Sequence, residues 1–264
     1  IAAYWKMEND GSDSSINSNV ASSQGSASFS SNSKVGSSSL SLDGASDYMS
    51  VPSSATLEPT AITISAWVYL KQGTDPYSVI VDKPYTAHVD PYYDFHFRFS
   101  DTNSANPNLS ASFVVGTYTG ADSVSITNLG YLYDSWTHVT ASFDGVDIKL
   151  YINGKLEGTS NNPGAITYHG QDLRIGAFKN LAIGDFKGEI DEVVIWNTSL
   201  DGSEVETLYT QQAQNYTELS SSWTPEHSSL VGYWKMDGNW KDSIGTNHGV
   251  AIDNLTFISE RQVG

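Results

Sequence analysis

Cysteine is absent from this chain of 264 residues. Its absence excludes disulfide scaffolds, thiol nucleophiles and cysteine-ligated zinc in one step. A protein exported without disulfides needs another source of stability, and a large apolar core or a bound metal ion can supply it. The length suits one large β-domain with an appended segment, because β-sandwiches often exceed roughly 200 residues.

Positive charge is also scarce, with 13 Lys and Arg against 30 Asp and Glu and a net charge of −17. That balance argues against binding to nucleic acid or to an anionic membrane through long-range attraction. It suits calcium binding or a salty exterior. Long apolar runs are lacking too, since no stretch approaches the roughly 18 residues of a membrane-spanning helix. We therefore expect no nucleic-acid partner and no membrane span.

The residues that are abundant favour strands. Fifteen tyrosines, seven tryptophans and 22 glycines suit strands and turns better than helices. A hydrophobic fraction of 39% is sufficient for a core. The richness in Ser, Thr, Asn and Gly is typical of extracellular proteins, so we expect a secreted or cell-surface location.

Residues 136–158 carry the clearest strand pattern. His138, Thr140 and Ser142 alternate with apolar residues, which predicts a strand with one apolar side and one side facing solvent. A second alternating strand follows, and Asn153-Gly154 then tolerates the positive φ that a two-residue hairpin turn requires. The pattern predicts three consecutive antiparallel strands and contains no helical period.

Several segments resemble, in the same order, the motifs of laminin-G-like domains in the concanavalin A-like lectin/glucanase superfamily. They are Leu-Ser-Leu-Asp-Gly at 40–44, Ile-Thr-Ile-Ser-Ala-Trp-Val at 62–68, the 136–158 stretch, Leu-Arg-Ile-Gly at 173–176 and Gly-Glu-Ile-Asp-Glu-Val at 188–193. The resemblance covers about residues 1–210 and implies an all-β fold, a two-sheet antiparallel jelly-roll sandwich. It also implies that the polar segment 22–39 is an ordered connection laid over the sandwich.

One short helix is predicted near residues 201–210. Asp201 or Ser203 can cap its start, and Val205, Leu208 and Tyr209 form one apolar face. The predicted sandwich domain, residues 1–210, ends with this helix.

The end of the chain repeats its beginning. Tyr-Trp-Lys-Met at 233–236 matches Tyr-Trp-Lys-Met at 4–7, and an acidic residue follows each copy. We therefore interpret residues 211–229 as a linker and residues 230–264 as the opening segment of a second repeat. Either the chain is a piece of a tandem-repeat protein, or the tail is a donor strand that joins subunits by adding to an exposed sheet edge.

The acids Glu189, Asp191 and Glu192 resemble the catalytic E-x-D-x-x-E motif of laminarinase-type glucanases, which share this fold. Those enzymes need a third acid pointing into the groove, but residues 193–195 are all apolar. We therefore predict no catalytic residue and no enzyme activity. His96, Arg98 and a tyrosine match the residue types of a polysaccharide lyase, but the sequence motifs of that family are missing.

A structural calcium ion is implied by the resemblance. In concanavalin A-like sandwiches its ligands are the Asp of the closing strand, an acid or carbonyl just after the first strand, and a carbonyl near the Asp-Gly of the second strand. Carried over to this sequence, the ligands are Asp191, Glu8, Asn9, Asp43 and Gly44. Calcium takes six to eight hard oxygens, which suits this mixture of carboxylates and carbonyls. The alternative is that Glu8 and Asp43 are only solvated turn residues.

The predicted recognition surface lies around residues 82–98. Phe95, Phe97 and Phe99 share one side of a strand, which places alternate polar residues on the other side beside an aromatic loop. Aromatic faces stack on sugar rings, and Arg, Asp and His supply paired donors and acceptors. The predicted ligand-binding residues are Lys83, Tyr85, His88, Tyr92, Asp94, His96 and Arg98. The alternative is an ordinary solvated strand face with cross-strand charge pairs.

Together these features predict a non-catalytic carbohydrate-binding or adhesion module, secreted or on the cell surface and stabilised by calcium. Its expected partner is a glycan or another extracellular ligand. A second hypothesis is a structural subunit of an extracellular filament or sheath, assembled through residues 230–264. A third is a polysaccharide lyase or glycoside hydrolase.

Overall fold

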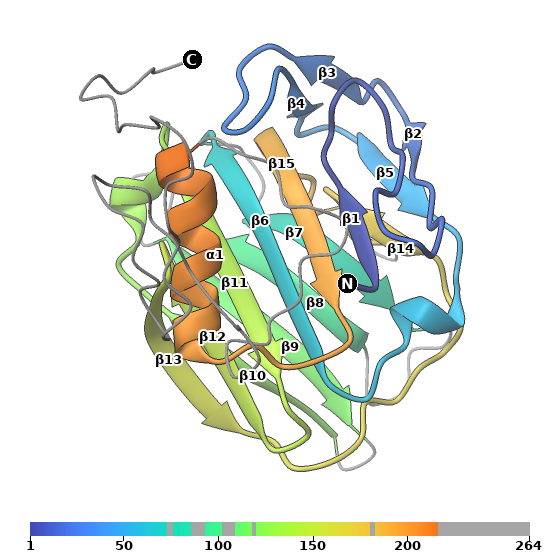
Figure 1. The fold of residues 1–264 in the computed structure, drawn as a ribbon, viewed down its shortest axis with the longest axis vertical. Helices are drawn as coiled ribbons and strands as arrows, with labels where there is room; N and C mark the ends of the chain where they lie inside the picture. The colour runs from blue at the N-terminus through green and yellow to red at the C-terminus, as the bar shows by residue number, and fades with distance from the viewer. Residues whose placement is uncertain (73–75, 86–92, 102–108, 118–119, 180–182, 216–264) are drawn as a thin grey trace, which may run out of the picture. The chain divides into compact units, whose positions relative to one another are not determined.

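In the computed structural model, two antiparallel sheets lie face to face, as the sequence predicts (Figure 1). The structure describes residues 1–72, 76–85, 93–101, 109–117, 120–179 and 183–215. All of these residues belong to one compact unit. Residues 216–229 of the predicted linker and the predicted opening of a second repeat, residues 230–264, lie outside the described residues.

The first sheet contains strands from four of the five segments that resemble laminin-G-like motifs, those at 40–44, 62–68, 136–158 and 188–193. Its strands run in the order β13 (Lys155–Asn161), β12 (Asp147–Ile152), β11 (Trp136–Phe143), β6 (Ile62–Leu70), β15 (Lys187–Trp196), β4 (Ser39–Asp43) and β3 (Ser28–Ser30), with β1 (Ala3–Trp5) also paired to β15. The predicted meander is confirmed as β11, β12 and β13, and Asn153 and Gly154 have φ values of 49° and 79° in its second turn.

The second sheet carries the predicted recognition strand. Its order is β10 (Gly120–Ile126), β9 (Ser110–Thr117), β8 (Tyr93–Ser100), β7 (Tyr77–Pro84), β14 (Leu173–Ile175), β5 (Tyr48–Val51) and β2 (Ser22–Gln24). The short 3₁₀ helices η1 (Ala55–Leu57) and η2 (Gly130–Leu132) lie in connections.

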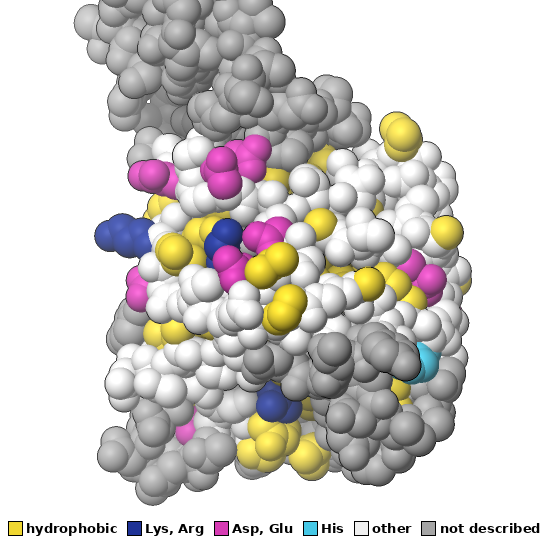
Figure 2. All heavy atoms as spheres, turned by 90° about the horizontal axis from the view of Figure 1, so that it is seen from below, with side chains coloured by type: hydrophobic (Ala, Val, Ile, Leu, Met, Phe, Trp, Pro, Cys, Tyr) yellow, Lys and Arg dark blue, Asp and Glu magenta, His cyan; other side chains and the backbone are white. Residues whose placement is uncertain are grey.

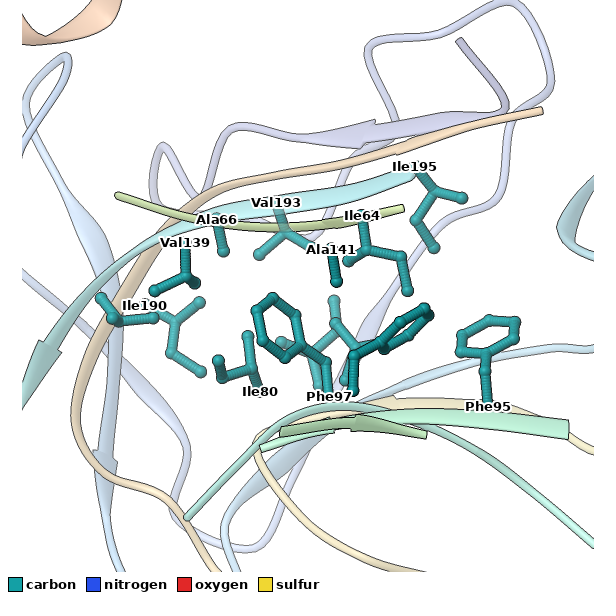
Figure 3. Close-up of a cluster of buried hydrophobic side chains, with 14 of the residues drawn as sticks. Ile64, Ala66, Ile80, Phe95, Phe97, Val139, Ala141, Ile190, Val193 and Ile195 are labelled. Carbon is teal, nitrogen blue, oxygen red and sulfur yellow. The ribbon is translucent and has the colours of Figure 1, made fainter. Parts of the chain in front are cut away.

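The core fills the space between the sheets with alternate residues from both of them (Figure 3). Phe95 and Phe97 of β8 point toward Ile64 and Ala66 of β6 across this space. Phe95, Phe97 and Phe99 are all buried, which confirms the predicted inward side of this strand. Polar residues of β8 must therefore face away from the core, because successive side chains of a strand alternate between its two sides.

The predicted helix forms as α1 (Gly202–Asn215) and continues five residues beyond the predicted end at 210. Asp201, rather than Ser203, caps it: the Asp201 carboxylate accepts hydrogen bonds from the backbone N–H of Ser203 and Glu204 at 2.8 and 2.9 Å. The Glu204 carboxylate accepts in return from the Asp201 N–H at 2.7 Å, which completes a capping box. The predicted linker thus begins inside the helix.

Helix α1 lies in front of the eight-stranded sheet (Figure 1) and packs on its outer face. Val205 and Leu208 join Tyr4, Tyr151 and other residues of the sheet in a second buried cluster. This contact corrects the prediction that His138, Thr140 and Ser142 face solvent, because all three are buried. The His138 ring lies 5.1 Å from Trp67 and 5.9 Å from Tyr209 of the helix, and burial lowers the pKa of His138 to about 3.

A hydrogen-bond network fixes the helix on this face. The Gln212 amide nitrogen donates to Glu192 at 2.8 Å, and its amide oxygen accepts from Trp67 Nε1 at 3.0 Å. The Tyr4 hydroxyl donates to the same Glu192 carboxylate. Because Gln212 and Glu192 are both buried, these bonds offset the cost of removing their polar groups from water. None of the helices in the described part of the chain is both long and apolar enough to cross a membrane.

The first prediction concerns the core. Phe97→Ala removes a fully buried ring from the centre of the sandwich and should lower the free energy of unfolding by about 3–5 kcal/mol. Urea unfolding followed by circular dichroism measures this loss. Val146→Ala is the control, because Val146 is 49% exposed and its truncation should change stability by less than about 0.5 kcal/mol. Equal effects of the two changes would contradict the assignment of the core.

Candidate functional site

The outer face of the seven-stranded sheet brings together polar side chains from three neighbouring strands. Arg174 of β14 pairs in register with Asp82 of β7, and Asp82 pairs with His96 of β8. Directly paired residues of antiparallel strands lie on the same side of the sheet. Arg174, Asp82 and His96 therefore form one row across the face that points away from the core.

Two of the predicted ligand-binding residues on this face are covered by the chain. Asp94 and His96 are 0% and 1% exposed. The Phe178 ring lies edge-on over His96 at 5.4 Å, and the Asp94 carboxylate accepts from the His169 N–H at 3.1 Å and also pairs with His169 Nδ1. The prediction that Asp94 and His96 are accessible to a ligand is therefore wrong, because residues around 169–178 fold back over them.

Lys83 is likewise buried, at the edge of the core. It pairs with Phe95, so its side chain points to the interior side of the sheet. Its ammonium group donates to the Gln171 carbonyl at 2.7 Å and lies 3.3 Å from the Glu58 carboxylate. Lys83 thus has a structural role rather than the predicted contact with a ligand, because a buried ammonium group needs this pairing.

Arg98 and Arg174 lie on the outer face and are only partly buried. The Arg98 guanidinium carbon is 4.2 Å from the ring centre of Tyr77, and that of Arg174 is 4.1 Å from the ring centre of Tyr48. Guanidinium groups stack on aromatic faces through cation–π attraction. Two arginine–tyrosine stacks on one sheet face are the main accessible feature of the site.

Phe178 links the two stacks. Arg174 Nη1 donates to the Phe178 carbonyl at 3.0 Å, and the Arg98 guanidinium lies 5.7 Å from the Phe178 ring. Of the predicted ligand-binding residues, Arg98 belongs to one of the two stacks, and the buried His96 lies under Phe178. Tyr85 is buried with 9% exposure, and His88 and Tyr92 lie outside the described residues.

Sequence reasoning missed Arg174, Tyr48, Tyr77, His169 and Phe178. Strand alternation could have predicted the outward direction of Arg174, because this residue stands between two apolar residues of its strand. The position of β14 between β5 and β7 was not readable from the sequence. That position decides which tyrosine Arg174 meets.

Carboxylates lie beneath the arginines. Asp82 Oδ2 accepts from the Lys179 N–H at 3.1 Å, while Asp82 Oδ1 is buried with no hydrogen-bond partner among the described residues. Burial raises the pKa of Asp82 to about 7. Burial also raises the pKa of Asp94, against the opposing hydrogen bonds from His169, and lowers the pKa of His96 well below its usual value. The charges are thus layered, with enclosed acids below and partly exposed guanidinium groups above.

The predicted calcium ligands are divided between two places. Asp191 and Glu8 both contact the loop formed by residues 34–38. Asp191 is fully buried: its Oδ2 accepts from the N–H groups of Lys34 and Val35 at 2.9 and 3.0 Å, and its Oδ1 has no hydrogen-bond partner among the described residues. The orphaned Oδ1 is an oxygen that a cation could take. Burial raises the pKa of Asp191 to about 7.

Glu8 is already held by hydrogen-bond donors. It accepts from the Ser37 N–H at 2.9 Å and from the Ser37 hydroxyl at 2.6 Å. Gly36 permits this approach, because its φ is +66° and a Cβ there would lie 2.0 Å from Glu8 Oε1. Asn9 follows with an exposed side chain, and its N–H donates to Ser38 Oγ at 2.7 Å. These contacts confirm that segment 22–39 is an ordered connection.

Asp43 and Gly44 lie elsewhere. Asp43 pairs with Lys187, four residues before Asp191 on β15, which separates the two acids by about 13 Å along the strand. Asp43 is exposed and accepts from the Ala45 N–H at 2.7 Å. Within the described ranges, no three His, Cys, Asp or Glu residues come together in an arrangement that could hold a metal ion. A calcium site at Asp191 and Glu8 would therefore depend on carbonyl oxygens for its remaining ligands.

Comparison with protein families agrees with the fold. A laminin-G-type model described as the concanavalin A-like lectin/glucanases superfamily matches residues 43–206. No curated protein matches the chain.

Solved structures with the same fold share little sequence with the chain. Domain 4 of AbnA, an extracellular arabinanase from Geobacillus stearothermophilus solved with arabinotriose, is 21% identical with a TM-score of 0.56, and the match covers 79% of this chain and 97% of that domain. The botulinum neurotoxin serotype D binding domain is 12% identical with a TM-score of 0.58, over 80% of this chain and 51% of that one. The binding domain of Paraclostridial Mosquitocidal Protein 1 is 16% identical with a TM-score of 0.56, over 76% and 49%. The chain thus spans about half the length of these two toxin binding domains.

The second prediction concerns the buried Asp82. Its pKa is about 7 in the folded state, against an ordinary value of about 3.9 when unfolded, so between these values only the folded state keeps the proton. Stability should therefore fall as pH rises from about 4 to about 7, by up to about 1.4 kcal/mol per pH unit. Asp82→Asn should remove this part of the pH dependence in urea unfolding measured from pH 4 to 8. Glu206→Gln, an exposed helix residue, is the control. An unchanged pH profile in Asp82→Asn would refute the assignment.

Proposed function

We propose that this chain, which belongs to the concanavalin A-like lectin/glucanase superfamily, is a non-catalytic carbohydrate-binding module that acts outside the cell. The observation that carries the proposal is the pair of arginine–tyrosine stacks, Arg98 on Tyr77 and Arg174 on Tyr48, on one face of one sheet. Aromatic rings contribute apolar contact to a sugar ring, and guanidinium groups donate to its oxygens. Backbone pairing within a sheet holds these side chains in place before a ligand arrives.

The structural neighbours support the same proposal. Domain 4 of the arabinanase carries arabinotriose, and the toxin structures are described as binding domains. These proteins share the fold at low identity, so their ligands indicate a class of function rather than a particular sugar.

Burial of the acids supports a non-catalytic role. Asp82 and Asp94 are enclosed beneath the outer face, and His96 lies under Phe178, so none of the three can reach a glycosidic bond or a sugar proton at the surface. The motif acids Asp191 and Glu192 are also buried, under the 34–38 loop and α1. A glycosidase needs two carboxyl groups that flank the substrate.

The filament hypothesis stays a prediction. Its donor segment, residues 230–264, lies outside the described residues. Strand addition would need an edge, and within the described residues the sheets end in β13 and β3 and in β10 and β2.

The third prediction tests glycan binding on the outer face. A glycan array identifies bound sugars for the full chain, and titration calorimetry then measures affinity for the best ligand. Tyr77→Ala and Tyr48→Ala should each weaken binding by about 5–10-fold, because each removes a ring that stacks on the sugar or holds its arginine. Tyr69→Ala is the matched control, since Tyr69 is a partly buried tyrosine of the opposite sheet. Binding that depends on Tyr69 alone would contradict the proposed face.

The fourth prediction concerns calcium at Asp191 and Glu8. If the orphaned Asp191 Oδ1 ligates Ca²⁺, millimolar Ca²⁺ should raise the melting temperature by several degrees above that in a chelator, because a ligand bound only to the folded state stabilises it. Asp191→Asn should abolish this rise in melting temperature. Asp43→Asn should leave the rise unchanged, because Asp43 lies too far along the strand from Asp191 to share the same ion. A melting temperature that is the same with Ca²⁺ and with chelator would contradict a calcium site at Asp191 and Glu8.

A further inference from the structure

A row of three side chains lies beside helix α1 on the outer face of the eight-stranded sheet. Tyr69 of β6 pairs in register with Trp136 of β11 on one side and with Glu189 of β15 on the other. The row is displaced by two positions from Trp67 and His138, which contact α1, so it shares their side of the sheet. Both aromatic residues of the row are partly exposed, whereas the glutamate is buried. We call these three residues the aromatic–acid row.

Two buried polar atoms of this row lack a partner. Trp136 Nε1 is a donor and Glu189 Oε2 is an acceptor, and neither has a hydrogen-bond partner among the described residues. The other glutamate oxygen, Oε1, accepts from the Lys71 ammonium group at 2.9 Å. An unpaired buried donor or acceptor is costly, because it has left water without gaining a new hydrogen bond. A ligand that offers a donor to Glu189 and an acceptor to Trp136 would remove this cost at both ends of the row.

The aromatic rings of the row already accommodate a cation. The Tyr69 and Trp136 rings meet edge to face, with centres 5.7 Å apart, and the Lys71 ammonium group lies 5.7 Å from the centre of the Tyr69 ring. Aromatic faces attract cations through the charge distribution of the ring. The Lys71 side chain is 43% exposed, whereas that of Glu189 is 6% exposed. Lys71 is therefore the mobile partner of the ion pair, and a cation that fits the row better can take its place.

The charge of the protein favours a cationic ligand. The net charge is −17, and on the molecular face drawn in Figure 2 acidic side chains are more prominent than basic ones. Near the row, the exposed Asp134 lies beside the end of β6, where its N–H donates to the Leu70 carbonyl at 2.9 Å. Lys187, two positions before Glu189, pairs in register with the exposed Asp43, which offsets its charge. A cation is thus attracted to this surface, and an anion is repelled.

We propose that the aromatic–acid row docks an arginine side chain carried on an extended segment of a partner protein. The guanidinium group displaces the Lys71 ammonium group, lies against the Tyr69 ring and donates to both oxygens of Glu189. A backbone carbonyl of the same segment accepts from Trp136 Nε1, which lies two strand spacings away, about 10 Å. Arginine fits better than lysine, because its planar fork matches a carboxylate and stacks on a ring. This surface lies on the sheet opposite the proposed glycan site, so it adds a protein partner to that function.

The test compares peptides that differ in one side chain. Acetylated and amidated pentapeptides carry arginine, citrulline or lysine between two pairs of glycines, and NMR chemical shifts of the full chain follow their binding. Citrulline keeps the shape of arginine and loses its charge. We expect the arginine peptide to bind at least about tenfold more tightly than the citrulline peptide, with the lysine peptide between them. The affinity for the arginine peptide should fall as salt rises.

Variants assign the effect to residues. Glu189→Gln should weaken binding of the arginine peptide by about tenfold and leave the citrulline peptide nearly unchanged. Trp136→Phe keeps a ring and removes the donor, so it should weaken all three peptides by a similar factor. Lys71→Met removes the internal competitor and should strengthen binding of the arginine peptide by about threefold or more. Glu206→Gln, an exposed helix residue, is the control for net charge. Thermal melting establishes that each variant is folded, and Lys71→Met keeps the test decisive where Glu189→Gln is unfolded.

The outcomes separate this inference from the proposed glycan binding. Equal affinity for the arginine and citrulline peptides would overturn the role of the carboxylate. A preference for arginine that persists in Glu189→Gln would overturn the assignment to this row, and weaker binding in Lys71→Met would overturn the displacement of the lysine. No binding of any peptide at millimolar concentration would overturn the docking surface. Glycan affinity should be unchanged in all of these variants, so either proposal can fail while the other holds.

Discussion

Buried carboxylates on the outer faces of both sheets constrain this structure more than any other feature. A carboxylate removed from water is costly unless hydrogen bonds or charges satisfy it. In each case the partner comes from a segment distant in the sequence. Glu192 Oε2 accepts from Gln212 of α1, and Asp191 Oδ2 accepts from the amides of Lys34 and Val35. Asp82 Oδ2 and the Asp94 carboxylate accept hydrogen bonds from residues 169–179 in the same way.

The covering segments decide what remains accessible. On the eight-stranded sheet, α1 closes the face over His138 and Trp67. On the seven-stranded sheet, the cover is narrower. Phe178 shields His96, while Arg98 and Arg174 remain partly exposed on either side of it. Stability and recognition thus use the same segment, because the residue that buries His96 also positions both arginines.

Strand alternation predicted much of this architecture correctly. The inward rings of β8, the meander of β11 to β13 and the capping of α1 are local, and each depends on residues a few positions apart. Alternation failed wherever a second layer covered the outer face. His138, Asp94 and His96 have the spacing of solvent-facing residues and are nevertheless buried, because a strand cannot indicate whether another segment will pack on its polar side. The prediction for Lys83 was wrong for a different reason, because Lys83 pairs with Phe95 and alternation itself places its side chain on the interior side of the sheet.

Alternation and motifs in a fixed order were enough to predict the sandwich, its family and the side of each strand that carries apolar residues. Which polar residues come together in a site depended on how the strands and loops pack in three dimensions. Arg174 meets Tyr48, and Arg98 meets Tyr77, because β14 lies between β5 and β7 and residues 169–179 cross the face beside them. Such neighbours are set by sheet order and by long-range packing, and residues far apart in the chain carry no local signal of either.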